Sequence, residues 1–172
     1  MSLSLGVFGV HRHHGNRPNP AFVAADRVLD RSASGPKWLE VEAIADLIAG
    51  TIQIGEHERY LYELAAWVVM PNPVHLLILP KVPVRVILRW LKGSTARKAN
   101  LLLGRRGKRF WQDESSDHWV RNSREFERII RYIEENPVTD GLVTSAALWL
   151  WSSAGWQAKP PAPPTSDLTL EM

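Results

Sequence analysis

The chain has 172 residues, of which 45% are apolar and eight are tryptophan, enough to bury the core of a single domain. It contains no cysteine, which excludes disulfides, thiolate metal sites and a cysteine nucleophile, and fits a reducing cytoplasm. The net charge of +3 is too small to assign a partner by itself. No apolar run approaches the roughly 20 residues that cross a bilayer, and the first residues lack the basic start of a signal peptide, so we expect no membrane partner.

Residues 1–18 form a segment whose structure the sequence determines poorly. Within it, residues 5–10 alternate weakly with glycine and predict a poor edge strand. The histidines at 11, 13 and 14 resemble a metal-binding tract, but the surrounding glycine, proline and asparagine favour a flexible polar segment. Residues 21–31 then predict a short amphipathic helix, which a serine- and glycine-rich break ends.

The next elements have clearer patterns. Apolar residues recur at helical spacing over 44–52 and predict a core-facing helix that ends near Gly55. The polar segment 56–63, with alternating tyrosines, predicts a strand that leads into residues 65–70. After a Pro-Asn-Pro break, residues 74–79 form a continuous apolar run bounded by prolines, typical of a strand buried on both faces at the centre of a sheet. So short a connection predicts an antiparallel hairpin.

The second half of the chain predicts two further helices. Residues 84–103 form a long helix with one basic side, and a basic loop follows at 104–108. The last helix begins with Ser123 as its N-cap and ends at Asn136, because Pro137 disfavours helix at the residue before it.

Helices and strands joined by hairpin connections predict an α+β domain, with an antiparallel sheet and helices on one or both faces. We place this domain at residues 19–157. Residues 158–172, which contain the run PPAPP, predict a disordered or polyproline tail.

Residues 85–131 are dense in arginine and lysine and are interleaved with aromatic residues. Such a stretch suits a phosphate backbone with bases stacked on the rings, although a solvated basic face has the same composition. The aromatic residues are Trp90, Phe110, Trp111 and Trp119.

One histidine, His75, lies in the central apolar run. It is either a core histidine satisfied by a hydrogen bond or a metal ligand that projects from the strand. On the last helix, Tyr132 and Asn136 are four residues apart and share a face with Arg128. A tyrosine can attack a phosphate ester, and a metal held by imidazole and a carbonyl oxygen would polarise that ester. The alternative is a half-buried helix tyrosine and an asparagine that caps the helix before Pro137.

Four segments, read in order, resemble the REP-associated tyrosine transposases, a branch of the HUH/tyrosine class of single-strand DNA transposases. They are WVVMPNPVHLLILP, then FWQDESSDHWVR with EFERIIRYIEENPVTDGLV, then WLWSSA. The resemblance covers about residues 38–154 and implies a ferredoxin-like sheet with the two-histidine HUH motif on a central strand. It also implies cleavage of single-stranded DNA by a tyrosine, with Mg²⁺ or Mn²⁺ and a 5′-phosphotyrosine that conserves the phosphodiester without ATP.

By this resemblance Tyr132 matches the nucleophile, His75 the second motif histidine and Asn136, by spacing, the metal ligand on the helix. The first histidine position is Pro73, which has no side-chain donor or acceptor and cannot bind a metal. A site with two protein ligands instead of three is expected to bind a hard cation more weakly.

Three functions are therefore open. The chain is a transposase or nickase that acts on hairpin-forming repeats, or it binds structured single strands without cutting them, or it is a decayed product. The resemblance implies a cytoplasmic, nucleoid-associated monomer, with a dimer as the alternative. In the first reading the residues that contact the DNA backbone are Arg105, Arg106, Lys108, Arg109, Arg121, Arg124 and Arg128.

Overall fold

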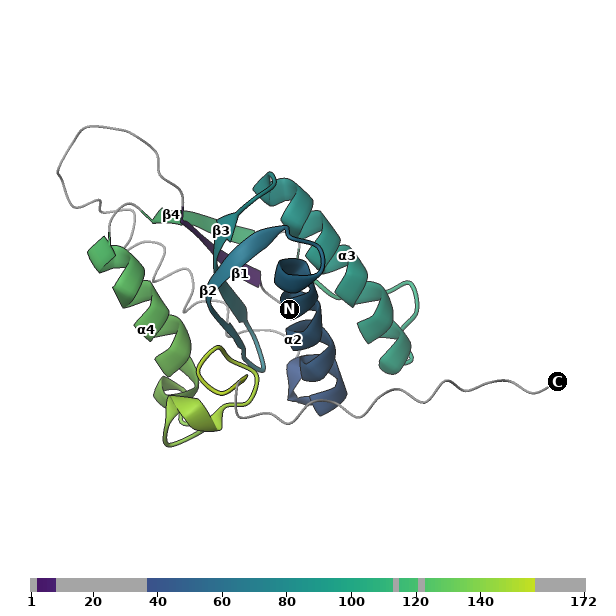
Figure 1. Ribbon diagram of the computed structural model, residues 1–172. Coiled ribbons are helices and arrows are strands. Elements are labelled where there is room, and N and C mark those ends of the chain that lie inside the picture. The colour runs from purple at the N-terminus through teal and green to yellow at the C-terminus, as the bar shows by residue number, and fades with distance from the viewer. Residues whose placement is uncertain (1–2, 9–36, 113–114, 121–122, 157–172) are drawn as a thin grey trace.

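A four-stranded sheet with helices on both faces forms the centre of the protein. The computed structural model describes residues 3–8, 37–112, 115–120 and 123–156. The strands are β1 (Leu3–Phe8), β2 (Tyr62–Val69), β3 (Val74–Pro80) and β4 (Ser115–Val120), and the α-helices are α2 (Glu42–His57), α3 (Val84–Leu102) and α4 (Ser123–Thr139). Helices α2 and α3 cover one face of the sheet and α4 covers the other (Figure 1). The predicted α+β class is confirmed.

The strand order is β2-β3-β1-β4, so β3 is an inner strand, as its apolar run predicted. Strands β2 and β3 form the predicted antiparallel hairpin, and the Asn72–Pro73 peptide bond in its connection is cis. Strand β1 pairs in parallel with both β3 and β4. The expected poor edge strand is therefore an inner strand, and the sheet is mixed where we expected it to be wholly antiparallel.

The direction of β1 differs from the expectation for a physical reason. A short connection fixes the direction of β3 against β2, because it permits only an antiparallel return. Residues 9–36 separate β1 from the next described element, and so long a connection permits either direction.

The face covered by α2 and α3 holds the larger apolar core. Helix α2 turns Ile44, Ile48 and Ile52 toward it, all fully buried. A side chain larger than glycine does not fit at Gly55, because its Cβ would collide with the phenol ring of Tyr62. That phenol donates a hydrogen bond to the Ile52 carbonyl oxygen at 2.8 Å, which ties β2 to α2.

Two predicted boundaries are wrong. The segment 56–63 ends α2 and turns at Tyr60, which has a positive φ of 52°, so β2 begins only at Tyr62. Helix α4 continues past Pro137 to Thr139. The proline is tolerated there because it lies in the last turn, where its missing N–H removes one bond and its own carbonyl accepts the N–H of Leu142 at 2.9 Å.

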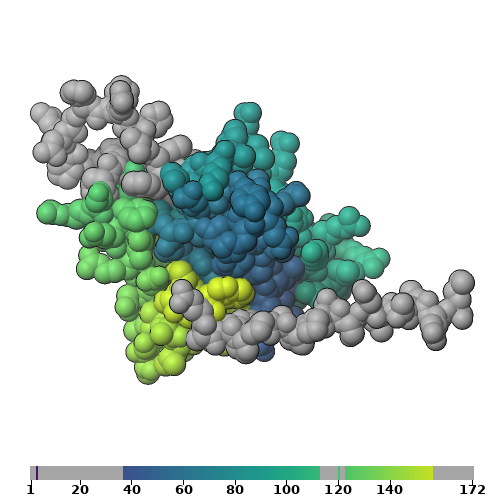
Figure 2. All heavy atoms as spheres, viewed as in Figure 1, coloured from purple at the N-terminus to yellow at the C-terminus, as the bar shows by residue number. Residues whose placement is uncertain are grey.

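The segment after α4 returns to the sheet and covers the outer edge of β2. Ser152 forms an antiparallel bridge with Val68, and the backbone hydrogen bonds Val69 N–H to Trp151 O and Ser153 N–H to Trp67 O are each 2.8 Å long. In Figure 2 this segment lies between α4 and α2, as yellow atoms between green and blue ones.

Several predictions lie outside the described residues: the histidine-rich segment, the helix at 21–31 and the tail at 158–172. No described helix is long and apolar enough to span a membrane.

Candidate active site

His75 projects from β3 toward α4. Side chains alternate along a strand, and Val74, Leu76 and Ile78 pack in the core on the α2 and α3 face, whereas Leu77 packs against α4. His75 is therefore on the α4 face, where it is 4% exposed. Burial lowers the pKa of His75 to about 4, so the imidazole is neutral at pH 7 and keeps a nitrogen lone pair.

Tyr132 meets His75 from the facing helix. The apolar side chains Ile129 and Ile133 hold α4 against the sheet, and Tyr132, which is half-buried, lies beside that stripe. The ring centroids of His75 and Tyr132 are 5.8 Å apart and the ring planes cross at 77°, an edge-to-face contact. The two residues that the sequence singled out separately thus lie together within one chain.

Asn136 lies one turn after Tyr132 on the same flank of α4. It is inside the helix, so the alternative of a terminal cap is wrong. Its Nδ2 is a buried atom with no hydrogen-bond partner among the described residues. An unpaired buried N–H donor costs about 1–3 kcal/mol, so a bound hydrogen-bond acceptor would stabilise this position.

A divalent metal fits these residues only in part. His75 offers a neutral imidazole nitrogen, and Asn136 offers its amide oxygen, whereas the unpaired amide nitrogen of Asn136 is a donor that a cation does not satisfy. Pro73 is buried directly before β3 and offers only its backbone carbonyl, which already accepts the Met70 N–H at 3.0 Å. In the described part of the chain, no group of three or more His, Cys, Asp or Glu side chains is arranged to hold a metal. These residues therefore offer two of the three protein ligands that the resemblance implies.

The basic residues divide between two layers of the molecule. Arg124 and Arg128 are exposed on α4, the helix that carries Tyr132. Residues 105–109 follow α3 and lie on the opposite side of the sheet (Figure 1). Arg121 is outside the described residues. The structure therefore does not bring the loop cations to His75 and Tyr132.

The loop itself shows which of its cations have structural roles. The guanidinium of Arg105 lies 3.8 Å from the centre of the Trp38 ring, a cation–π contact, and the residue is half-buried. Arg106, Lys108 and Arg109 are exposed.

Two aromatic residues expected to stack on bases are instead part of the core. Phe110 is 2% exposed and stacks on Trp38, with ring centroids 5.5 Å apart. Trp111 is 6% exposed and donates its Nε1–H to Thr95 Oγ1 at 2.8 Å. Trp90 is half-buried, and the side chain of Trp119 is not among those described. The stacking interpretation is wrong for Phe110 and Trp111, because composition does not distinguish a core ring from a surface ring.

A surface pocket of about 300 Å³ lies at the outer edge of β2, lined by Gln53, Glu56, His57, Leu64, Ala65, Trp67, Ser153 and Trp156. It contains neither His75 nor Tyr132. Ser153 has no histidine partner there, because its hydroxyl donates to the Glu134 carboxylate at 2.8 Å. The pocket therefore lacks an activated serine, and the chemistry of the described residues centres on His75 and Tyr132.

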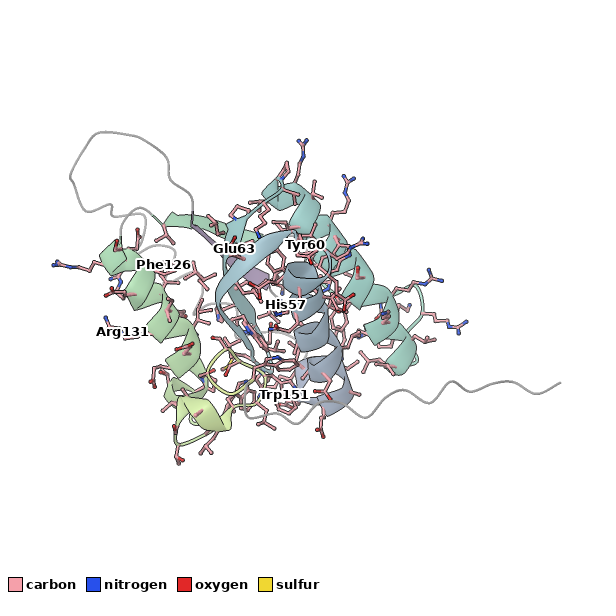
Figure 3. The ribbon with its side chains drawn as sticks, viewed as in Figure 1. His57, Tyr60, Glu63, Phe126, Arg131 and Trp151 are labelled. Atoms are coloured by element: carbon pink, nitrogen blue, oxygen red, sulfur yellow. The ribbon has the colours of Figure 1, made fainter. Side chains whose placement is uncertain are left out.

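No sequence pattern predicted a role for Glu134 or for its partner Ser153, which lies in the segment after α4. Figure 3 shows Arg131, on α4, pointing away from the sheet, and Trp151, in the segment after α4, beside α2, where its Nε1–H donates to Asp46 Oδ1 at 2.9 Å. Ser153 belongs to the WLWSSA segment, which the resemblance singled out without assigning a role to either of its serines.

Residues 45–136 match the family model described as "Transposase IS200 like", more than half of the chain. The chain belongs to the IS200-like transposase family. The matched span runs from α2 to Asn136 and includes Pro73, His75 and Tyr132.

A relative from Escherichia coli (strain K12), a REP-associated tyrosine transposase, is 30% identical over 95 residues, which are 54% of this chain and 54% of that protein. The chain thus spans about half the length of that curated relative. No solved structure gives a significant match. The resemblance to REP-associated tyrosine transposases is confirmed at the level of the family.

Proposed function

We propose that this transposase-like protein acts on single-stranded, hairpin-forming DNA, with Tyr132 as its nucleophile. The contact between the Tyr132 and His75 rings supports the proposal most strongly, because a phenol and a neutral imidazole from the family-matched span lie side by side. DNA as the partner follows from the family, and the single-stranded and hairpin character is part of the proposal.

In the proposed reaction the Tyr132 oxygen bonds to the scissile phosphorus as the bond from phosphorus to the 3′ oxygen breaks. The phenol proton leaves to solvent, and the departing oxygen takes up a proton to become a 3′-hydroxyl. The product is a 5′-phosphotyrosine, which a later hydroxyl reverses by the same exchange. Neither ATP nor a hydrolytic water is consumed.

His75 and Asn136 would hold Mg²⁺ or Mn²⁺, which would neutralise charge on the phosphate. Pro73 weakens this site, because it replaces a ligand with a ring that has no donor atom. Arg124 and Arg128, on the same helix as Tyr132, would contact the DNA backbone. Arg121 and the loop cations Arg105, Arg106, Lys108 and Arg109 remain proposed contacts for DNA outside the site. The proposed protein is a cytoplasmic monomer associated with the nucleoid.

The test is a cleavage assay on single-stranded repeat hairpins with Mg²⁺ or Mn²⁺, resolved by denaturing gel. We expect the unmodified chain to form a covalent protein–DNA adduct slowly and Tyr132→Phe to form none, because the nucleophile is gone. The matched control is Tyr60→Phe, which removes a hydroxyl from a tyrosine that is 67% exposed.

Pro73→His should increase adduct formation and metal affinity. The expected gain is at least the roughly tenfold change that follows when a group supporting a metal ligand is altered. Pro71→His adds an imidazole to the same connection, off the motif position, and should leave the rate unchanged. Adduct that persists in Tyr132→Phe would overturn the assignment of the nucleophile.

The second candidate function is a protein that binds hairpin DNA without cutting it. Pro73 at the first motif position is the observation that favours it. Binding to hairpins in a filter or fluorescence assay, with no adduct from any version of the chain, would establish this second function.

A further inference from the structure

A side-chain hydrogen bond between Ser153 and Glu134 joins the segment after α4 to that helix. Ser153 is held at the outer edge of β2 by hydrogen bonds to Trp67. Its N–H donates to the Trp67 carbonyl oxygen at 2.8 Å, and its Oγ accepts the Trp67 N–H at 3.2 Å. The same Oγ lies 2.8 Å from Glu134 Oε1 and 3.4 Å from the Trp67 carbonyl. The single hydroxyl proton therefore goes to the carboxylate, the shorter contact.

Glu134 and Tyr132 lie on opposite flanks of the apolar stripe of α4. At roughly 100° per residue, Tyr132 and Asn136 fall on one side of Ile129 and Ile133, and Glu134 falls on the other. Glu134 reaches the outer edge of β2 through Ser153, whereas Tyr132 reaches His75 on the next strand, β3. The helix thus touches the sheet at three places across its width.

This arrangement controls rotation of the helix about its axis. Apolar contacts are non-directional, so the stripe alone permits α4 to roll by small angles. A hydrogen bond to a charged group is directional and strong, and Ser153 is itself held by two hydrogen bonds to the backbone of Trp67, one through its N–H and one through its Oγ. A roll that moved Tyr132 off His75 would break the bond on the opposite flank.

We infer that Ser153 and Glu134 are positioning residues that hold Tyr132 against His75. This inference rests on the proposed function for its consequence in catalysis, but the geometry it describes exists without DNA. The bond between Ser153 and Glu134 keeps the tyrosine oxygen in reach of a phosphate beside His75. Neither residue touches the reacting atoms.

The experiment uses the full chain and four variants: Ser153→Ala, Glu134→Ala, Glu134→Gln and Glu135→Ala. The glutamine keeps an oxygen that accepts from Ser153, and Glu135 is an exposed neighbour on α4 that controls for the loss of one charge. The first readout is the nuclear Overhauser effect between the rings of Tyr132 and His75, measured without DNA or metal. The second is the rate of adduct formation on hairpin DNA.

We expect Ser153→Ala and Glu134→Ala to weaken the ring-to-ring effect strongly and to slow adduct formation by on the order of tenfold to a hundredfold, as misplacement by about 1 Å does. DNA affinity should not change, and Glu134→Gln and Glu135→Ala should behave as the unmodified chain. If Ser153→Ala does not fold, as circular dichroism would show, Glu134→Ala carries the test.

An unchanged ring-to-ring effect in Glu134→Ala would overturn the inference. Absence of adduct from the unmodified chain would instead contradict the proposed function, and the ring-to-ring effect would still test the positioning. Loss of the effect in Glu134→Gln as well as in Glu134→Ala would overturn the claim that the hydrogen bond, and not the carboxylate charge, holds the helix.

Discussion

The two faces of the sheet are built differently. The face under α2 and α3 is a continuous apolar core, with fully buried residues such as Ile48 and Leu91. The face under α4 has a smaller apolar cluster and contains a buried histidine, a half-buried tyrosine and an asparagine with an unpaired amide nitrogen. The first face contributes most of the apolar burial, whereas the second places polar side chains against the sheet, and burial of polar groups lowers stability.

The largest expected effect on stability is Leu91→Ala, on the first face. Leu91 is 0% exposed, so the truncation leaves a cavity. It should lower the free energy of unfolding, measured by urea denaturation, by about 2–5 kcal/mol. The control is Leu102→Ala on the same helix. Leu102 is 59% exposed, and its truncation should change stability by less than about 0.5 kcal/mol. Equal effects of the two changes would contradict a core centred on this face.

Tyr62→Phe tests the link between β2 and α2. Removing the hydroxyl leaves the Ile52 carbonyl without its partner and should lower the free energy of unfolding by about 1–2 kcal/mol near neutral pH. The control is Tyr60→Phe, at an exposed tyrosine.

The same residue has a pH signature. Burial and, to a smaller degree, the Glu56 carboxylate raise the pKa of Tyr62 above its usual value of 10.0. Above pH 10, the unfolded tyrosine ionises while the folded one keeps its proton, so stability that is present below that pH is lost as pH rises. Tyr62→Phe should remove this part of the alkaline loss in urea titrations from about pH 8 to about pH 11. An identical alkaline loss in the variant would show that another group causes it.

The smallest expected effects are changes in the salt dependence of DNA binding, which show on which side of the sheet the DNA lies. Arg124→Gln, on the α4 side, should lower the slope of log affinity against log salt by about 0.7, the value for one contact with a single strand. Arg106→Gln, in the loop after α3, should leave the slope for a short single strand unchanged, because that loop lies on the other side of the sheet from α4 (Figure 1). A change in the slope for Arg106→Gln alone would place the strand on the other face.

The elements with long apolar periodicity were predictable. Helices α2 and α3 and strand β3 followed from apolar spacing, and the hairpin followed from its short connection. The direction of β1 was not predictable, because pairing in a sheet depends on distant segments. The continuation of α4 beyond Pro137 was missed, because a proline in the last turn loses little.

Within the site, the sequence identified His75 and Tyr132 but could not show that they touch. One lies on a strand and the other on a helix 57 positions later, and only the fold brings them together. The hydrogen bond between Ser153 and Trp67 spans 86 positions, and no sequence pattern in either segment predicts it. The burial of Phe110 and Trp111 was not predictable either, because the composition of a basic stretch does not show whether its aromatic rings lie in the core or on the surface.

The bridge between Ser152 and Val68 has a consequence for the behaviour of shortened chains. Strand β2 is the outermost strand, and the returning segment occupies its backbone N–H and C=O groups. A chain that ended after α4 would expose those groups and the apolar residues beside them, which is the condition for pairing between copies and for aggregation. Fragments for expression should therefore extend at least through Trp156, so that the edge of β2 pairs with residues 151–153 of the same chain and not with a second copy.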